Sequence, residues 1–394
     1  MYIRRWIEDK IKDLLKIFPV IVISGPRQVG KTTLLKNSTL FKKAKYISFD
    51  DLGTLAILSE SPSMVIPDSD IVIIDEVQRF PQILLEIKKI VDENPKRKFI
   101  LSGSSNLLLL KNVSESLAGR AYYLYLQPFT CSEIKGYKNN FSSLLNADFD
   151  FKYPSPLNLE KQIFTGLFPK LIEFDKNIEI TYWWQGYINT YLEKDLRSIS
   201  NIQNLPQFAN FIITTAERVG NLLNETSIST HTNISQSTIS RYINLLETLF
   251  IFSRVYQFRL SLAQGIKKMP KIYIADTGLI CSLLKIKDQK IPQYLKGKLF
   301  ENFIFQQLLV HTSLMGAELF FWREKQKEID FIISYNHNVF PIEVKLSKKV
   351  NIADAKNIIE FSKRTKISNG FVIYNGNEII QIGKKIYAIP WYLL

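Results

Sequence analysis

The sequence predicts an α/β protein that opens with a parallel sheet and continues into smaller domains. Three apolar runs, at residues 20–23, 71–74 and 99–101, have the length of buried strands, and each is followed by small or acidic residues. A helical spacing of apolar residues at 82–91 lies between the second and third runs. A chain of 394 residues has the length of two or three domains. We therefore expect an α/β core in residues 1–150, followed by segments 151–204, 205–270 and 271–394.

The composition narrows the class of protein. The formal net charge of +14 favours a polyanionic partner such as nucleic acid, although a lysine-rich coding bias would also produce it. Cys131 and Cys281 are the only cysteines and lie far apart, which predicts reduced thiols in a cytoplasmic protein. The three histidines leave little room for histidine-based catalysis. No apolar run is long enough to span a membrane, so we expect no membrane partner.

The first strand, at residues 20–23, runs into a loop bounded by Gly25 and Gly30 and followed by Lys31 and Thr32. This is the P-loop pattern in its required context of strand, loop and helix start. The glycines let successive backbone N–H groups point at phosphate oxygens, Lys31 reaches the outer phosphates, and the Thr32 hydroxyl can ligate Mg²⁺. The predicted nucleotide contacts are Gly25, Pro26, Arg27, Gln28, Val29, Gly30, Lys31, Thr32 and Thr33.

The strand at residues 71–74 is followed by Asp75 and Glu76, the pattern of a Walker-B strand. In a parallel sheet these carboxylates emerge beside the phosphates. We expect Asp75 to hold Mg²⁺ through water and Glu76 to orient and polarise the attacking water.

Two further positions are candidates for sensing the nucleotide. The strand at 98–101 is followed by small polar residues, of which Ser104 is the first candidate and Ser102 the second. A role as the N-cap of the next helix is compatible with sensing. Arg120 precedes the strand at 121–126. It is a candidate γ-phosphate sensor, or a finger that acts on a neighbouring subunit of a homo-oligomer, and a structural role is the alternative.

These motifs resemble those of archaeal and bacterial AAA-type ATPases, which carry G-P-R-Q-V-G-K-T, I-D-E-V-Q, a G-S-S turn and a G-R before the fifth strand. The resemblance runs along essentially the whole chain, and in that family a C-terminal region of unknown function follows the ATPase core. It implies ATP as the nucleotide and places nucleotide binding on residues 25–33, Asp75 and Glu76. It implies no settled physiological role.

Residues 151–204 are predicted to be a helical lid or linker. Trp184, Tyr187, Ile188, Tyr191 and Leu192 fall on one face of a helix, which favours core packing over base stacking.

Residues 205–270 resemble a winged helix, with helices at 208–219 and 227–231, a third helix that Ser235 opens, and a β-rich wing at 250–256. Lysines 267, 268 and 271 follow the wing. The exposed start of the third helix is where a recognition helix touches DNA, although such domains also serve protein contacts alone. The candidate DNA contacts are Gln236, Ser237, Thr238 and Arg241.

Residues 271–394 resemble the core of PD-(D/E)xK nucleases, in which a helix glutamate precedes a strand aspartate and an E-x-K strand. Strand periodicity places Glu343 and Lys345 on one face. Glu301, Asp330 and Glu343 are then candidates to cage a divalent metal, and Lys345 to orient or deprotonate water that attacks a phosphodiester. A domain that keeps this fold for binding or structure is the alternative.

Together these patterns predict an ATP hydrolase of the AAA type that requires ATP and Mg²⁺ and acts on DNA. The attacking water would be oriented by Glu76, with Lys31 and Arg120 stabilising the transition state. Two alternatives stay open. One is an ATP-licensed, structure-specific DNA endonuclease, and the other is a nucleotide-switched DNA-binding or scaffolding protein with little turnover.

Overall fold

The chain forms two compact units. The computed structural model describes residues 2–60, 62–103, 117–190, 202, 204–259 and 269–394. The first unit comprises residues 1–127 with residues 248–250, and the second comprises residues 128–247 and 251–394. The first unit thus ends before the predicted boundary at residue 150, and the three predicted later segments share one compact unit.

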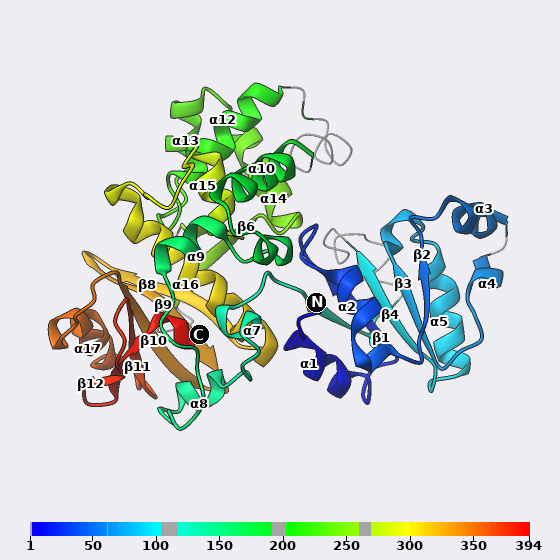
Figure 1. Cartoon of the computed structure of the whole chain (residues 1–394), viewed down its shortest axis with the longest axis horizontal. Coiled ribbons are helices and arrows are strands. Elements are labelled where there is room, and N and C mark those ends of the chain that lie inside the picture. Colours follow the sequence, from blue (N-terminus) through cyan, green and yellow to red (C-terminus); the bar gives the residue numbers. More distant parts are fainter. Residues whose placement is uncertain (1, 61, 104–116, 191–201, 203, 260–268) are drawn as a thin grey trace. The chain divides into compact units, whose positions relative to one another are not determined.

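The first unit is built on a five-stranded sheet in the order β2-β3-β4-β1-β5, and every neighbouring pair is parallel (Figure 1). The predicted parallel core is therefore confirmed. Its elements are α1 (Ile7–Leu14), β1 (Val20–Ser24), α2 (Lys31–Asn37), β2 (Lys45–Ser48), α3 (Leu52–Glu60), α4 (Pro62–Val65), β3 (Ile71–Asp75), α5 (Ile83–Glu93), β4 (Lys98–Gly103) and β5 (Ala121–Tyr125).

The core of this unit follows from the two periodicities of its sequence. Alternate residues of β1, β3 and β4 place valine, isoleucine, phenylalanine and leucine side chains on one face of the sheet, where the apolar stripe of α5 packs against them. Ile87 is fully buried in this layer, so its replacement by alanine is expected to cost about 2–5 kcal/mol of stability. Because all five strands are parallel, the carboxyl ends of β1, β3 and β4 meet at one edge of the sheet.

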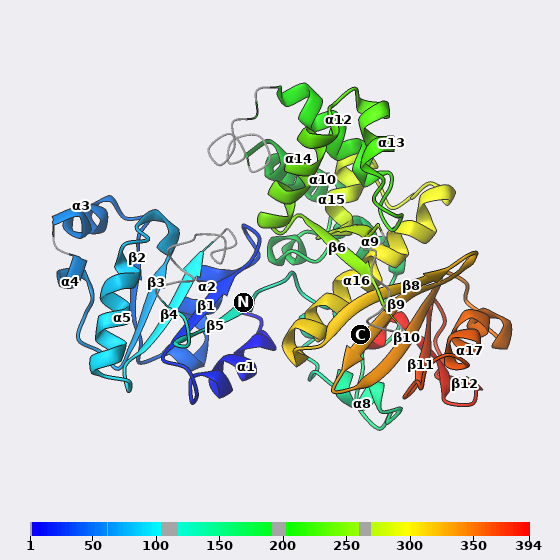
Figure 2. The same cartoon turned by 180° about the vertical axis from the view of Figure 1, so that it is seen from behind.

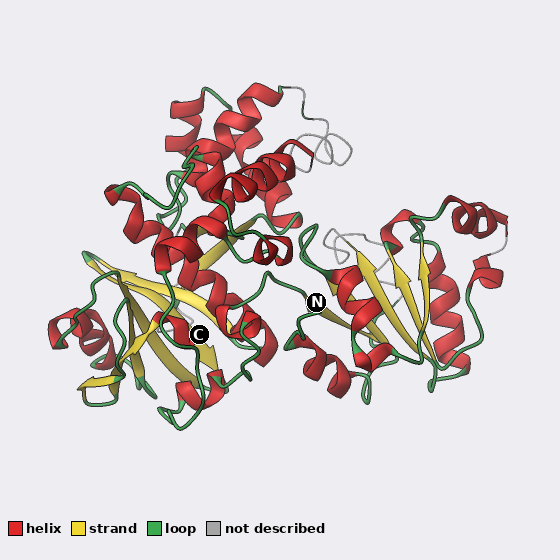
Figure 3. Ribbon diagram, in the orientation of Figure 1, coloured by secondary structure: helices red, strands yellow, loops and turns green. Residues whose placement is uncertain are grey.

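The second unit contains ten α-helices within the described residues and one eight-stranded sheet, which Figure 3 colours red and yellow. The helices are α7 (Cys131–Ile134), α8 (Phe141–Leu145), α9 (Leu159–Thr165), α10 (Asn177–Tyr187), α12 (Leu205–Ala216), α13 (Glu225–Thr232), α14 (Gln236–Thr248), α15 (Thr277–Leu283), α16 (Gln293–Met315) and α17 (Lys356–Ser362). The strands are β6 (Phe252–Gln257), β7 (Lys271–Ile274), β8 (Glu318–Glu324), β9 (Lys327–Tyr335), β10 (Asn338–Lys345), β11 (Gly370–Tyr374), β12 (Ile380–Gly383) and β13 (Ile386–Pro390).

The order of strands in this sheet is β12-β13-β11-β10-β9-β8-β6-β7 (Figure 2). Strand β6 pairs with β8 in parallel and with β7 antiparallel. Helices α12, α13 and α14 lie where the three winged-helix helices were predicted. The two strands that follow them do not form a separate wing, because they extend the sheet of the C-terminal segment.

Helix α10 carries the aromatic stripe of the predicted lid. Trp184 and Tyr187 are buried, and their rings lie edge-on to Phe168 with centroids 5.3 and 5.5 Å away. These two side chains therefore serve core packing, as predicted. Tyr191 and Leu192 lie outside the described residues.

Two further expectations concern the cysteines and the membrane. Cys131 and Cys281 are both buried free thiols. Within the described ranges, no helix combines the length and the apolar character that crossing a bilayer would need.

Candidate functional site

The loop between β1 and α2 has the backbone geometry that a P-loop requires. A Cβ atom at Gly25 would lie 2.3 Å from the carbonyl oxygen of Leu126, so only glycine fits there without a shift of the backbone. Gly30 has a φ of 98°, in the left-handed region that favours glycine. Gln28 also has a positive φ, of 60°. The loop is therefore a closely turned segment at the carboxyl end of β1, as the sequence pattern predicts.

Lys31, the first residue of α2, turns its side chain back into this loop. Its ammonium donates hydrogen bonds of 2.8 Å to the carbonyl oxygens of Gly25 and Pro26, and only 6% of the residue is exposed. Burial lowers the pKa of Lys31 to about 8, against the opposing charges of Glu76 and Asp75. The group that is predicted to contact outer phosphates thus already lies within the loop that would hold them.

Asp75, at the end of β3, accepts hydrogen bonds from three hydroxyl groups. The Thr32 hydroxyl and the Tyr46 hydroxyl each donate to its Oδ2 atom at 2.7 Å, and Ser102 donates to its Oδ1 atom. The structure therefore brings together Thr32 and Asp75, the two residues predicted to hold Mg²⁺. Both present oxygen atoms, the donor type that Mg²⁺ prefers, so this pair fits the ion that the P-loop pattern implies.

Glu76 follows Asp75 with a backbone φ of 56°, which turns the chain sharply at the end of β3. Its carboxylate accepts a hydrogen bond from the side-chain amide of Gln78. Burial raises the pKa of Glu76 above its usual value, while the Gln78 hydrogen bond and the charge of Lys31 oppose the shift. The predicted water-orienting carboxylate is therefore held in a fixed position beside the Asp75 site.

Sequence reasoning missed three side chains of this edge: Tyr46, Gln78 and Arg5. In the parallel register of β2 and β3, Tyr46 lies opposite Ile73 and Ser48 opposite Asp75, so Tyr46 and Asp75 share a face. The register of β2 and β3 cannot be deduced from a single sequence, so the contact between Tyr46 and Asp75 was not predictable. Gln78 stands two residues after Glu76 in the I-D-E-V-Q motif, and this proximity could have indicated the contact between them.

Arg5 is a buried side chain that precedes the first helix and contacts the P-loop. Its guanidinium donates to the carbonyl oxygen of Val29 at 3.3 Å and to that of Gln127 at 2.7 Å. It thereby joins the loop to the last residue of the first unit. No motif in the sequence pointed to this contact.

Of the predicted sensor positions, the second candidate, Ser102, lies at this edge, where its hydroxyl donates a hydrogen bond to Asp75, and Arg120 does not. Ser104 lies outside the described residues. The backbone carbonyl of Arg120 accepts a hydrogen bond from the N–H of Val20, the first residue of β1. Arg120 therefore lies at the amino end of the sheet, opposite the P-loop, and its guanidinium pairs with Asp92. A role of Arg120 at the nucleotide of its own chain does not fit this position.

The four candidate DNA contacts lie in the first two turns of α14. Gln236, Ser237 and Arg241 are exposed and Thr238 is half-buried. The Ser235 hydroxyl donates to the hydroxyl of Thr238 at 2.9 Å and accepts from the N–H of Thr238, as expected of a residue that opens a helix. The candidate side chains therefore present one exposed polar surface. Of the lysines predicted to support it, Lys271 is buried, and Lys267 and Lys268 lie outside the described residues.

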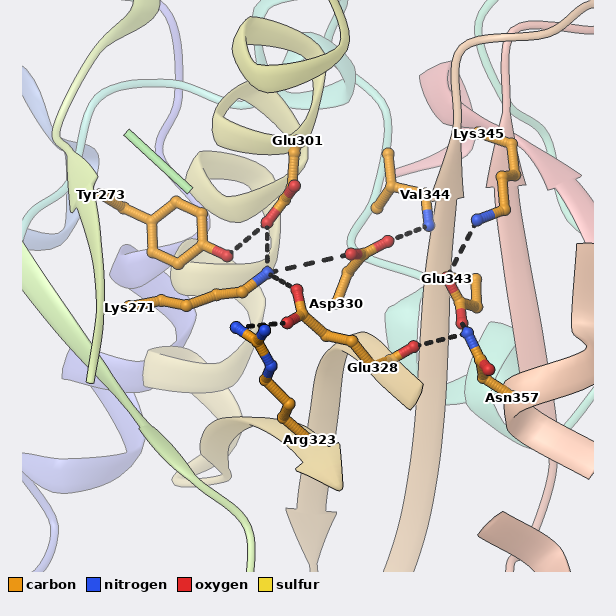
Figure 4. Close-up of polar contacts among 10 residues, drawn as sticks. All are labelled: Lys271, Tyr273, Glu301, Arg323, Glu328, Asp330, Glu343, Val344, Lys345 and Asn357. Atoms are coloured by element: carbon orange, nitrogen blue, oxygen red, sulfur yellow. Dashed lines mark hydrogen bonds and ion pairs between the residues drawn. The ribbon is translucent and has the colours of Figure 1, made fainter. Parts of the chain in front are cut away.

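Two of the four predicted nuclease-like residues, Glu301 and Asp330, lie around Lys271 together with Glu328, as Figure 4 shows. The Lys271 ammonium lies 2.9 Å from Glu301 Oε1, 2.7 Å from Glu328 Oε1 and 3.9 Å from Asp330 Oδ1. We name Glu301, Glu328 and Asp330 the carboxylate cluster. Glu328 was not among the predicted site residues.

Glu343 and Lys345 lie on the neighbouring strand β10 and interact with each other. The Lys345 ammonium donates to Glu343 Oε2 at 3.1 Å, and Asn357 donates to Glu343 Oε1 at 3.0 Å. Burial, followed by the charge of Asp330, raises the pKa of Glu343. The predicted placement of Glu343 and Lys345 on one face is therefore found.

The resemblance to nucleases implies a divalent metal among Glu301, Asp330 and Glu343, and the described residues do not fit one. No three or more His, Cys, Asp and Glu side chains in the described part of the chain are grouped so that they could hold a metal ion. The cation among the carboxylates is the Lys271 ammonium.

Comparisons with known proteins divide the chain into three segments. Residues 18–135 match the family model of the AAA domain. Residues 157–290 and 296–394 match two models described as domains of unknown function (DUF8612 and DUF4143). The first unit therefore has the fold of an AAA-type P-loop ATPase, which its parallel sheet and its P-loop also show.

Similar proteins extend over most of the chain. An uncharacterized protein of Mycobacterium tuberculosis is 24% identical over 396 residues, covering 98% of this chain and 83% of that protein. An uncharacterized protein of Haemophilus influenzae is 24% identical over 416 residues, covering 100% and 97%. Among solved structures, the Walker-type ATPase paby2304 of Pyrococcus abyssi is 17% identical, covers 72% of this chain and 96% of that chain, and has a TM-score of 0.49.

Proposed function

We propose that the protein is an ATP hydrolase that depends on Mg²⁺. The observation that carries this proposal is the meeting of Lys31, Thr32 and Asp75 at the carboxyl edge of the parallel sheet, with Glu76 directly beside them. A P-loop lysine, a hydroxyl and carboxylate pair for the metal, and a second carboxylate are the groups that phosphoryl transfer to water needs.

Binding of the triphosphate follows from the loop. Backbone N–H groups between Gly25 and Thr33 line the turn and donate to phosphate oxygens. Lys31 exchanges its two carbonyl partners for the outer phosphates, and the phosphate charge restores its full protonation. Thr32 and Asp75 would hold Mg²⁺, which supplies neutralisation of the phosphate charge when it is bound.

Hydrolysis requires a water aligned with the outer phosphorus atom. Glu76 accepts a hydrogen bond from this water and orients its lone pair, while Gln78 restrains the carboxylate. Lys31 stabilises the charge that spreads over the equatorial oxygens in the transition state. Ser102 and Tyr46 keep Asp75 in position.

The test is ATP turnover by the purified full-length chain, compared with Glu76→Gln and Lys31→Ala. Glu76→Gln keeps the shape of the side chain, and we expect it to lower turnover by about a hundredfold or more while ATP binding persists. Lys31→Ala should lose both binding and turnover. Gln82→Ala lies outside the site and serves as the control variant. It should retain wild-type binding and turnover.

Two results would reject this proposal. One is wild-type turnover that is no faster than that of Glu76→Gln under conditions where ATP binding is saturated. The other is undiminished ATP binding by Lys31→Ala. The first result with binding retained would favour a nucleotide-switched protein with little turnover.

We further propose that DNA is the macromolecular partner. What supports it is the exposed polar surface at the start of α14, together with a formal net charge of +14. Affinity for duplex DNA should then fall steeply with salt, because phosphate contacts release counterions. Arg241→Ala should weaken binding. Arg364 is also exposed but lies outside α14, so Arg364→Ala should leave binding unchanged. Equal binding by both variants at all salt concentrations would remove α14 as the contact.

A further inference from the structure

The carboxylate cluster contains a lysine where the nuclease resemblance places a metal. Lys271 is the first residue of β7, and its side chain is 2% exposed. Its ammonium reaches Glu301 on α16 and both Glu328 and Asp330 on β9. A buried ammonium needs partners of opposite charge, and here it has three.

The oxygens of the cluster are already engaged by donors from the chain itself. Glu301 Oε1 also accepts from the Tyr273 hydroxyl at 2.6 Å, and Asp330 Oδ2 accepts from the N–H of Val344 at 2.8 Å. Glu328 Oε2 lies 3.6 Å from the Arg323 guanidinium. A divalent ion would have to displace Lys271 and would meet carboxylates that are already hydrogen-bonded (Figure 4).

The charge state of Lys271 agrees with this picture. Burial alone would lower the pKa of Lys271, but the charges of Glu301, Asp330 and Glu328 outweigh burial and raise the pKa above its ordinary value. The ammonium is therefore charged at neutral pH.

We propose that the Lys271 ammonium is the resident cation of the carboxylate cluster and excludes a divalent metal from it. The carboxylate cluster, which lies within residues 296–394, then receives its cation from a residue outside that range. Lys271 lies in the part of the chain that matches one family model, and the three carboxylates lie in the part that matches the next. The ion pairs join β7 to α16 and β9. This inference is independent of the proposed ATP hydrolysis.

The experiment measures Mn²⁺ binding to the full-length chain in the absence of nucleotide, by the electron spin resonance signal of free Mn²⁺. Lys271→Met has a similar length and no charge, and it leaves the carboxylates without their cation. We expect it to bind one more Mn²⁺ than the wild type, with an affinity about tenfold or more above any wild-type binding at the cluster. Mn²⁺ should also raise its thermal unfolding midpoint, which should be lower than that of the wild type without metal.

Three further variants test whether the additional Mn²⁺ binds at the carboxylate cluster. Lys271→Arg keeps a cation and should behave as the wild type, and adding Asp330→Asn to Lys271→Met should abolish the extra site. The Thr32 and Asp75 pair is the same in all variants, so the difference between variants reports on the cluster alone. The third variant is Asp330→Asn alone, which should leave Mn²⁺ binding of the wild type unchanged.

Two outcomes would overturn the inference. Wild-type binding of a Mn²⁺ that Asp330→Asn removes would show that Lys271 does not exclude the metal, and this comparison does not need Lys271→Met to fold. A folded Lys271→Met that binds no more Mn²⁺ than the wild type would show that Lys271 does not occupy a cation position.

Discussion

Burial and the neighbouring carboxylates have opposite effects on the pKa of Lys31. Lys31 lies within a loop whose carbonyl oxygens accept hydrogen bonds from its ammonium, and burial lowers the pKa of the ammonium to about 8. A phosphate ligand favours the charged form. The protonation of this side chain and the binding of nucleotide are therefore linked.

This linkage predicts how ATP affinity depends on pH. Below pH 8 Lys31 is already charged in the free chain, so affinity should be flat. Above pH 8 the free chain must take up a proton to bind, and affinity should fall by up to about tenfold per pH unit. Titration of a fluorescent ATP analogue between pH 7 and 9.5 measures this. Lys31→Ala should bind weakly with no such dependence, and a wild-type affinity that is flat to pH 9.5 would contradict the linkage.

At the scale of single residues, the sequence predicted the roles that local motifs define. Lys31, Thr32, Asp75 and Glu76 meet as expected because strand, loop and acids are adjacent in the chain or at the ends of neighbouring parallel strands. For Arg120 the motif left three roles open: a γ-phosphate sensor, a finger for a neighbouring subunit, or a structural residue. Arg120 precedes β5, and a residue that precedes a parallel strand lies at the opposite edge from the P-loop.

Long-range contacts were not predictable from the motifs. Lys271 is one of the lysines after the predicted wing that favour DNA as a partner. In the structure its partners are Glu301, Glu328 and Asp330, on elements whose packing cannot be read from sequence spacing. The exposure of a lysine depends on the whole fold, and this one is buried.

At the scale of elements, α16 carries a buried histidine. His311 is fully surrounded by protein and stacks on Phe141 of α8 with ring centroids 4.1 Å apart. Burial lowers the pKa of His311 to about 3. In the unfolded chain a histidine takes up its proton near pH 6.5, so acid favours unfolding.

This gives a prediction for stability. The contribution of His311 is complete above about pH 6.5 and is lost as pH falls towards 3, and between pH 7 and 5 the loss should be about 2 kcal/mol. Urea unfolding followed by tryptophan signals reports on the second unit, which holds four of the five tryptophans. His311→Phe preserves the stacking and should lack this part of the pH dependence.

The control is His231→Phe, because His231 is exposed on α13. It should keep the wild-type loss of stability between pH 7 and 5. An identical loss in His311→Phe and the wild type would contradict the assignment to His311.

Helices and strands with a strong apolar periodicity were predictable, but the strands with which they pair were not. The helices α12, α13 and α14 and the strands of the first sheet lie close to the predicted residues, because apolar spacing reports local structure directly. The pairing of β6 with β8 joins residues more than sixty positions apart. A short strand carries no signal in its own sequence for which neighbour it selects.

At the scale of the whole molecule, the two compact units predict two unfolding transitions in calorimetry. ATP with Mg²⁺ should raise the midpoint temperature of the first unit's transition only, because the P-loop lies in that unit. At an ATP concentration a hundredfold above Kd, the added stability should be about 2.7 kcal/mol. The Glu76→Gln background prevents turnover during the scan. Adding Lys31→Ala should abolish the shift, and equal shifts of both transitions would contradict independent units.

The boundaries of units were the least predictable feature at this scale. The sequence predicts a core that ends at residue 150, in a loop-rich stretch, whereas the first unit runs to Gln127 and adds residues 248–250. Loop composition marks a flexible connection only where the neighbouring elements do not pack on each other, and α7 and α8 belong to the second unit. The segments predicted at 205–270 and 271–394 likewise both contribute strands to one sheet.

That shared sheet limits how this chain can be inherited. Strands β6 and β7 belong to the segment at 157–290, and β8 to the segment at 296–394, yet they are hydrogen-bonded neighbours. A genetic recombination that replaced only the later segment would bury Lys271 against foreign side chains and leave β6 without a matched edge. The two segments should therefore pass between genomes as one cassette.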